Sequence, residues 1–326
     1  MAHELDMSNG RANMAYVGDV PWHGLGQTLS VDADIDTWTR EAGFDWEVKR
    51  GAITYEVRDE ENNPLRVETV PKRWALYRSD TGKPLSVMSS NYRITQPRDV
   101  MGFFRDLCDA SGGFKMETAG VLRGGATYWA LARADDSFDV GGGDVVNPYL
   151  LLATSCDGTL SNMAEFTSVR VVCANTLAVA AGQKEGQLRV PHSTDFDPVH
   201  FKTQLGLVGG SWARFKVEAV DLAKRTVSKE EATRFFIETF YGAEKEIDIE
   251  AKRPMLELVT NIYLQGIGQQ TKTATGTAWG LVNAVTRFAD HERKAGSNDL
   301  RLQASWFGAG ARMKRDAYAN ALALLD

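Results

Sequence analysis

The feature of this sequence that most constrains its fold is a series of turn signals between residues 46 and 170, each flanked by short extended runs. Short segments rich in Asp, Asn and Gly between two extended runs are typical of β-hairpins. Hairpins join antiparallel neighbours, so the series predicts a mainly antiparallel sheet. The turn signals are the acidic Asn-Pro segment at 59–64, Asp80-Thr81-Gly82-Lys83, Gly124-Gly125 and Asp157-Gly158.

Helical patterns interrupt these runs. A short helix is expected within residues 31–44, and a longer one begins near Pro97, a residue favoured in the first turn of a helix. After the last hairpin, the apolar run 171–182 ends at Gly182 and is expected to be a helix. These elements together predict a β-β-β-α core.

The chain changes character after a polar segment near residues 183–198. Ser228 stands three residues before Glu231, the spacing of a capping box, and Thr275 or Thr277 can cap a further helix. We therefore expect an α+β protein, a β-rich N-terminal region followed by an α-helical C-terminal region. Its expected parts are an N-terminal arm with a short helix over 1–45, a β-rich α+β core over 46–190 and a helical region over 198–326.

The composition fits a folded protein outside the membrane. Hydrophobic residues make up 43% of the 326 and charged residues 25%. No apolar run approaches the roughly 20 residues that span a bilayer, and the N-terminus lacks the pattern of a secretory signal. Three cysteines are too few and odd in number for a disulfide framework. These features predict a cytoplasmic location.

The sequence contains only weak signals for a reactive centre or a metal site. Cys156 and Cys173 show no close ligand pair and are expected to be small packing residues. The segment from His192 to His200, with two aspartates between them, is a poor metal constellation. The Gly-rich segments lack the spacing of a phosphate-binding loop, so we expect no metal and no cofactor.

Aromatic and basic residues on the central hairpins form the most informative candidate site. A sheet carrying both suits single-stranded nucleic acid, because bases stack on rings and cations follow the phosphates. Strand alternation would place Trp129, Leu131 and Arg133 on one face and Tyr128 on the other. The alternative is a core sheet with buried rings and solvated arginines. The candidate nucleic-acid-binding residues are Lys115, Arg123, Tyr128, Trp129, Arg133 and Arg170.

Arg170 interrupts an apolar run, so it either pairs with a carboxylate such as Glu165 or binds phosphate. The net charge of −6 does not favour nucleic acid. The acidic residues are unevenly distributed, however. Residues 1–163 hold 16 Lys and Arg against 24 Asp and Glu, whereas residues 164–326 hold 21 Lys and Arg against 19 Asp and Glu.

Five segments together resemble the phage/plasmid-like protein family built on domain of unknown function 932. They are PWHGLG, NYRITQP, TSVRVVCANTL, GTAWGLVNAVTRFADH and SWFGAGARMKRDA. The resemblance implies a protein of mobile DNA in a bacterial host, where recombination and counter-defence are common functions. The element order of residues 114–181 is also similar to the core of single-strand annealing proteins of the Rad52 and RecT type.

Our leading hypothesis is a non-catalytic, homo-oligomeric protein that binds single-stranded DNA and anneals it during recombination. Replacing Arg133 or Arg170 should then weaken binding. The alternative is a protein-interaction or structural factor, such as a counter-defence protein, with no DNA binding. A hydrolase using Asp157, Glu165 or Cys156 is a third possibility.

Overall fold

The computed structural model describes most of the chain. The residues it describes are 7, 10–18, 25–111, 113–170, 175–178, 187–194, 197, 212–242, 249–296 and 298–325.

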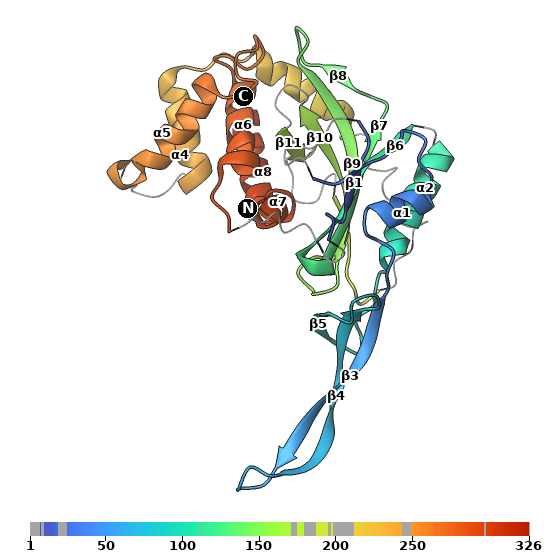
Figure 1. The fold of residues 1–326 in the computed structure, drawn as a ribbon. Coiled ribbons are helices and arrows are strands. Elements are labelled where there is room, and N and C mark those ends of the chain that lie inside the picture. Colours follow the sequence, from blue (N-terminus) through green and yellow to red (C-terminus); the bar gives the residue numbers. More distant parts are fainter. Residues whose placement is uncertain are drawn as a thin grey trace.

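A nine-stranded sheet forms the centre of the molecule (Figure 1). Its strands run in the order β11-β10-β9-β7-β6-β1-β2, with β12 paired to β10 and β8 to β9. All neighbours are antiparallel except β1 and β2. The strands are β1 (Met14–Tyr16), β2 (Gln27–Thr28), β6 (Phe114–Leu122), β7 (Thr127–Ala134), β8 (Phe138–Asp139), β9 (Val145–Ser155), β10 (Asn162–Arg170), β11 (Asn175–Ala178) and β12 (Gln187–Val190).

The hairpins expected from the sequence are confirmed. β6 and β7 meet at a short 3-10 turn, η1 (Arg123–Gly125), and β9 and β10 turn at Gly158, whose φ of 76° is a conformation that favours glycine. The fold is mixed α+β with mainly antiparallel sheets, as predicted.

The prediction of a helix over 171–182 is wrong for the part of that segment that the structure describes. Residues Asn175–Ala178 form β11, which pairs antiparallel with β10 from Thr167 to Arg170. A short apolar run does not distinguish a strand from a helix, and here the open edge of β10 offers a partner for its backbone groups. The β-β-β-α order therefore does not hold in the described residues, where two further strands follow β10.

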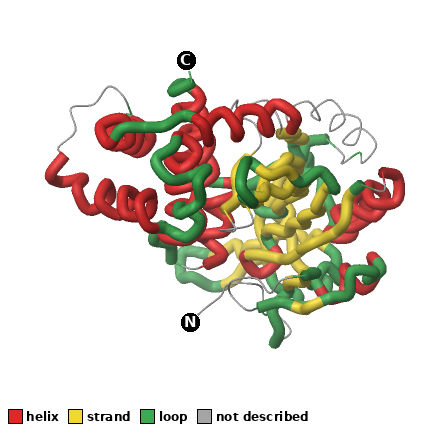
Figure 2. Tube along the Cα trace, turned by 90° about the horizontal axis from the view of Figure 1, so that it is seen from above, coloured by secondary structure: helices red, strands yellow, loops and turns green. Residues whose placement is uncertain are grey.

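Helices cover both faces of this sheet, with the strands between them in Figure 2. α1 (Ile35–Glu41) and α2 (Pro97–Ser111) pack on the face that carries Tyr128 and Leu150. The opposite face, with Trp129 and Leu151, packs against Trp306 and its neighbours in the C-terminal region. The face assignment from strand alternation is thus confirmed.

The C-terminal region is helical. Its largest core cluster also includes Val140 and Val146 of the sheet region. Ser228 and Glu231 form the expected capping box, and Thr277 caps α6. The helices are an unlabelled one over 212–224, α4 (Lys229–Tyr241), α5 (Ile249–Gln265), α6 (Ala278–Arg287), the π-helical η2 (Phe288–Glu292), α7 (Asn298–Phe307) and α8 (Ala309–Leu322). None of the described helices combines the length and apolar character needed to cross a bilayer.

A second, three-stranded sheet projects from this body (Figure 1). We call it the small sheet; it consists of β3 (Val48–Arg58), β4 (Pro64–Arg78) and β5 (Pro84–Ser89) in that order. Leu76 and Val48 belong to the core under α1 and α2 and anchor its base. The far end is a two-stranded hairpin, because β5 pairs with β4 only from Arg73 to Tyr77.

Candidate nucleic-acid interface

The two aromatic candidates on the central sheet are buried. Tyr128 and Trp129 are each 1% exposed, and the Tyr128 hydroxyl donates a hydrogen bond to the carbonyl of Thr95. The ring of Trp129 meets the ring of Trp306 edge to face, with centroids 4.7 Å apart. Neither ring offers an open face to a base, so base stacking by these two residues is corrected to a role in the core.

Lys115 and Arg133 are exposed cross-strand neighbours on β6 and β7. Arg133 is also directly opposite Tyr149 on the neighbouring strand β9, and the hydroxyl of Tyr149 donates a hydrogen bond to Glu117 at 2.6 Å. Asp135 and Asp136 follow β7 directly. These carboxylates are near the two cations along the chain, although Asp136 pairs with Lys216 at 2.6 Å, so this end of the sheet is of mixed charge.

Arg123 lies at the opposite end of β6 from Lys115, in the turn before β7. Its guanidinium is 2.6 Å from the carboxylate of Asp157. Burial opposes ionisation of Asp157, but hydrogen bonds from Thr159 and Ser155 together with Arg123 keep its pKa below the ordinary value. Arg123 is therefore already paired, and the six candidates do not form one surface.

Arg170 ends β10, where its backbone pairs with Val146 and Asn175. Its side chain lies outside the described residues, as does Cys173. Both expectations about them, a carboxylate or phosphate partner for Arg170 and a packing role for Cys173, stay predictions.

Cys156 is 1% exposed, and its thiol points at the carbonyls of Gly125 and Ala126. Burial, with Asp157 beside it, raises the pKa of this thiol to about 12. A nucleophilic cysteine requires the opposite shift. The environment is that of a packing residue.

His192 is also built into the core. Its ring stacks on Tyr92 with centroids 4.5 Å apart, and its two nitrogens lie 3.0 and 3.1 Å from the carbonyls of Leu160 and Arg93. Burial lowers its pKa. Among the described residues, no three His, Cys, Asp or Glu side chains are grouped to hold a metal ion.

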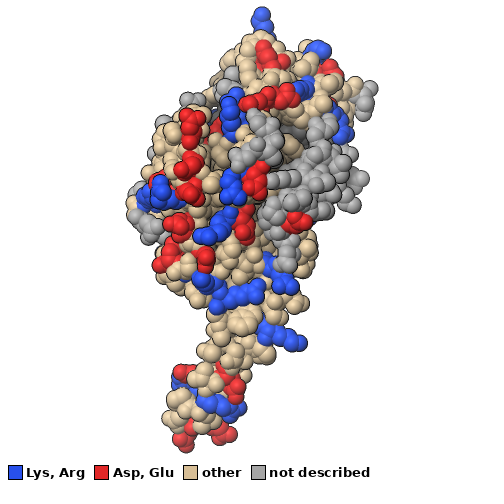
Figure 3. All heavy atoms as spheres, turned by 90° about the vertical axis from the view of Figure 1, so that its right-hand side faces the viewer, with Lys and Arg blue, Asp and Glu red and all other residues tan. Residues whose placement is uncertain are grey.

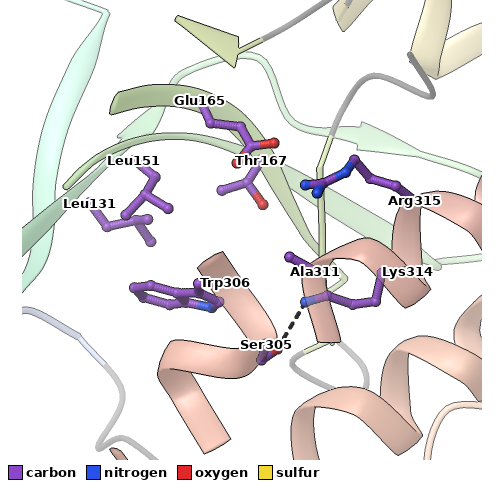
Figure 4. Close-up of a pocket in the computed structure, with 9 residues that line it drawn as sticks. All are labelled: Leu131, Leu151, Glu165, Thr167, Ser305, Trp306, Ala311, Lys314 and Arg315. Atoms are coloured by element: carbon purple, nitrogen blue, oxygen red, sulfur yellow. Dashed lines mark hydrogen bonds between the residues drawn. The ribbon is translucent and has the colours of Figure 1, made fainter. Parts of the chain in front are cut away.

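A small cavity lies between the central sheet and helices α7 and α8 (Figure 4). Lys314 is 4% exposed there and donates to Asp290 at 2.7 Å and to Ser305 at 3.0 Å. Glu165 is 6% exposed and lines the same space from β10. The volume of about 20 Å³ suits roughly one water molecule. The hydrogen bonds of Lys314 connect α8 with η2 and α7. The cavity is too small for an organic substrate.

Among the described residues, a group of cations lies at the base of the small sheet. Residues 47–55 and 69–98 hold eight Lys or Arg against two Asp or Glu. Of these two carboxylates, Glu47 pairs with Lys49 at 2.7 Å and Asp80 pairs with the buried Arg78 at 2.7 Å. Figure 3 shows Lys and Arg side chains gathered where this sheet joins the body, whereas both Asp or Glu and Lys or Arg side chains lie at its far end. We call the following residues the basic surface: Lys49, Arg50, Lys72, Arg73, Trp74, Tyr77 and Arg93.

Backbone pairing brings these residues together. Arg73 is opposite Ser89, the amide of Ser90 donates to the carbonyl of Lys72, and Arg50 donates to the carbonyl of Tyr92 at 2.6 Å. The segment 89–93 therefore connects the cations of β3 and β4 with Arg93. Lys72 and Arg73 are exposed, and neither makes an ion pair with a described residue.

Each face of the small sheet has an aromatic ring beside cations. Lys49 is opposite Tyr77, and Arg73 lies four residues before Tyr77 on the same face. A side-chain carbon on Gly51 would be 3.4 Å from the Tyr77 ring, so the ring lies over this glycine. On the other face are Arg50 and Trp74, and Trp74 is 37% exposed. Open rings next to exposed cations can stack on bases and contact phosphates.

Local structure adds to this exposure. Between the pairs Ala52–Trp74 and Thr54–Thr69, β4 has four residues and β3 has one. Lys72 lies in this bulge with φ of 56°. A bulge redirects side chains at the edge of a sheet, and this one carries Lys72 and Arg73.

The sequence contained a signal for this surface that we missed. The stretch TVPKRWALYRS, residues 69–79, has three cations, two aromatic rings and no carboxylate in a chain with an overall excess of acidic residues. Local charge along a predicted hairpin, rather than the charge of each half, would have identified it.

Comparison with known proteins gives one match. Residues 84–315 match the domain of unknown function DUF932. No curated protein and no solved structure matches the chain.

Proposed function

Because the chain belongs to the DUF932 family, which has no assigned function, we propose a function from its own geometry: it binds single-stranded DNA through the basic surface and anneals complementary strands without catalysis. One observation carries the proposal. The base of the small sheet combines the exposed cations Lys72 and Arg73, which make no ion pair with a described residue, with the partly exposed rings of Trp74 and Tyr77. In the central sheet, in contrast, the rings of Tyr128 and Trp129 are buried.

In this mechanism no bond is broken. Arg73, with Lys72 beside it in the bulge, neutralises phosphates, and a base stacks on Tyr77, which lies on the same face of β4 as Arg73. Stacking on an aromatic side chain contributes about 1–3 kcal/mol per base and tolerates any sequence. A protein that pairs two strands of arbitrary sequence needs this tolerance.

The two candidate surfaces can be tested against each other with matched variants. Lys72→Gln/Arg73→Gln removes two cations from the basic surface, and Lys115→Gln/Arg133→Gln removes two from the central sheet. All four side chains are exposed, so both variants should fold. Binding of a fluorescent oligothymidine is measured by anisotropy across a salt series, followed by annealing of complementary oligonucleotides.

The first variant should bind roughly tenfold or more weakly at low salt. The slope of log K against log salt should flatten by about 0.7 for each phosphate that the variant no longer neutralises. The second variant should bind like the wild type. Loss of binding only in the second variant would place the interface on the central sheet, and absence of binding by the wild type at low salt would refute the proposal.

The alternative, a protein-interaction factor without DNA binding, is favoured by the far end of the small sheet. Residues 54–69 hold five Asp or Glu against two Lys or Arg, and three large apolar side chains there are exposed. This segment repels phosphate and suits a protein partner. The same salt series separates the two functions, since a partner held by apolar contacts should not be released by moderate salt.

A further inference from the structure

The far end of the small sheet exposes three large apolar side chains to solvent. We call residues 54–69 the distal hairpin; they come from β3, β4 and the turn between them. Tyr55, Leu65 and Val67 are 53%, 59% and 65% exposed. A two-stranded hairpin alone is marginally stable in water, and packing of its side chains or addition of a strand stabilises it. A partner on this hairpin would supply both.

One edge of the distal hairpin is open over a defined length. Between Pro64 and Val70, none of the described strands pairs with β4 on the side away from β3. Pro64 and Pro71 flank this stretch, and proline cannot donate a hydrogen bond to a neighbouring strand. Alternate residues of an antiparallel strand direct their N–H and C=O groups to the same edge, so alternate residues within 65–70 form a template for one more strand.

The charges along this edge are complementary to themselves. The sequence is Leu65-Arg66-Val67-Glu68-Thr69. If two copies pair antiparallel about a two-fold axis at Val67, Arg66 faces the partner's Glu68 and Glu68 faces the partner's Arg66. Opposite charges directly across two strands stabilise the pair, and like charges oppose it.

The side chains fit this register on both faces. In the single chain, Arg66 Nε lies 2.7 Å from Glu68 Oε1, which places both on one face of β4. Val67 lies on the other face, where it would meet the partner's Val67. The pairing thus buries apolar surface on one face and forms two reciprocal ion pairs on the other.

We propose that the distal hairpin is a self-association element, in which the β4 edge of one copy pairs with the β4 edge of a second copy to form a continuous four-stranded sheet. The contact is isologous, so it closes into a dimer with two-fold symmetry. This goes beyond DNA binding and does not depend on it. The segment lies outside residues 84–315, the part of the chain that matches the family.

The test uses the full chain in sedimentation equilibrium at low salt. The wild type should dimerise, and Glu68→Arg, which sets Arg66 against arginine across the axis, should raise the dimer Kd about tenfold or more. The swapped variant Arg66→Glu/Glu68→Arg restores opposite charges and should return the Kd to within about threefold of the wild type. Both residues are exposed, so unchanged thermal unfolding of the monomer serves as the folding control.

A wild type that stays monomeric at the highest concentration would refute the proposal. A dimer with the same Kd in Glu68→Arg would also refute it, because the contact would then lie elsewhere. Oligonucleotide binding per chain by Glu68→Arg, measured in parallel, keeps this outcome separate from that of the proposed function.

Discussion

The two sheets of this molecule each contain a strand of 11 residues, β9 in the central sheet and β3 in the small sheet, but they have opposite surroundings. Every residue of β9 from Val146 to Ser155 is buried between two layers of helices, whereas β4 is exposed along nearly all of its outer half. The described rings of β7 and β9 are buried, while the small sheet has rings, cations and a free edge in solvent. The strands of the central sheet therefore form the core of the fold, and the exposed small sheet is where we propose that partners bind.

The largest effect that should separate the two sheets is on stability. Trp129→Ala removes a ring that is 1% exposed, so it should lower the free energy of unfolding by about 3–5 kcal/mol. Val67→Ala on the distal hairpin should change it by less than about 0.5 kcal/mol. Urea denaturation of the two variants measures both, and comparable losses of stability would contradict the division into core and exposed sheet.

Thiol reactivity should show how closed the central sheet is. Burial raises the pKa of Cys156 to about 12, so the thiol is protonated at pH 8 and poorly nucleophilic. Iodoacetamide should therefore label Cys156 in the folded protein far more slowly than in denaturant, as peptide mass spectrometry can follow. Cys156→Ser should keep DNA binding within about twofold, whereas rapid labelling in the folded state would show an open and reactive site.

The smallest effect concerns the turn of the distal hairpin. The carboxylate of Asp59 accepts hydrogen bonds from Asn63 and Glu61, and these lower its pKa below the ordinary value of 3.8. Because the folded pKa is the lower one, this carboxylate stabilises the turn above about pH 3.8, and the contribution disappears as the pH falls through the folded pKa. The amide NMR signals of Glu61 and Asn63 should shift in this window in the wild type, and Asp59→Asn should remove that titration.

The sequence allowed most of the fold to be predicted where local signals and burial agree. Gly158 and the Gly124-Gly125 pair marked hairpins correctly, and Ser228 with Glu231 marked a helix start. The strand at 175–178 was missed because its short apolar run suits a helix equally well, and only its pairing with β10 decides the matter.

The candidate site was predicted less well, for a physical reason. Alternation showed that Tyr128 and Trp129 lie on opposite faces, but it could not show that both faces are covered by helices. Nor could local pattern show that Arg123 meets Asp157, 34 positions further along the chain. Trp74 and Arg73 belong to a sheet with the same strand pattern, and their exposure depends on the lack of a covering layer over the described residues of that sheet.

Hydrogen–deuterium exchange of the full chain, with and without oligothymidine at low salt, would decide whether the small sheet is where DNA binds. We expect slower exchange on binding in residues 48–54, 72–78 and 84–93, with little change in 113–134. Protection confined to 113–134, or none in the small sheet under conditions where the oligonucleotide is bound, would contradict the proposed interface.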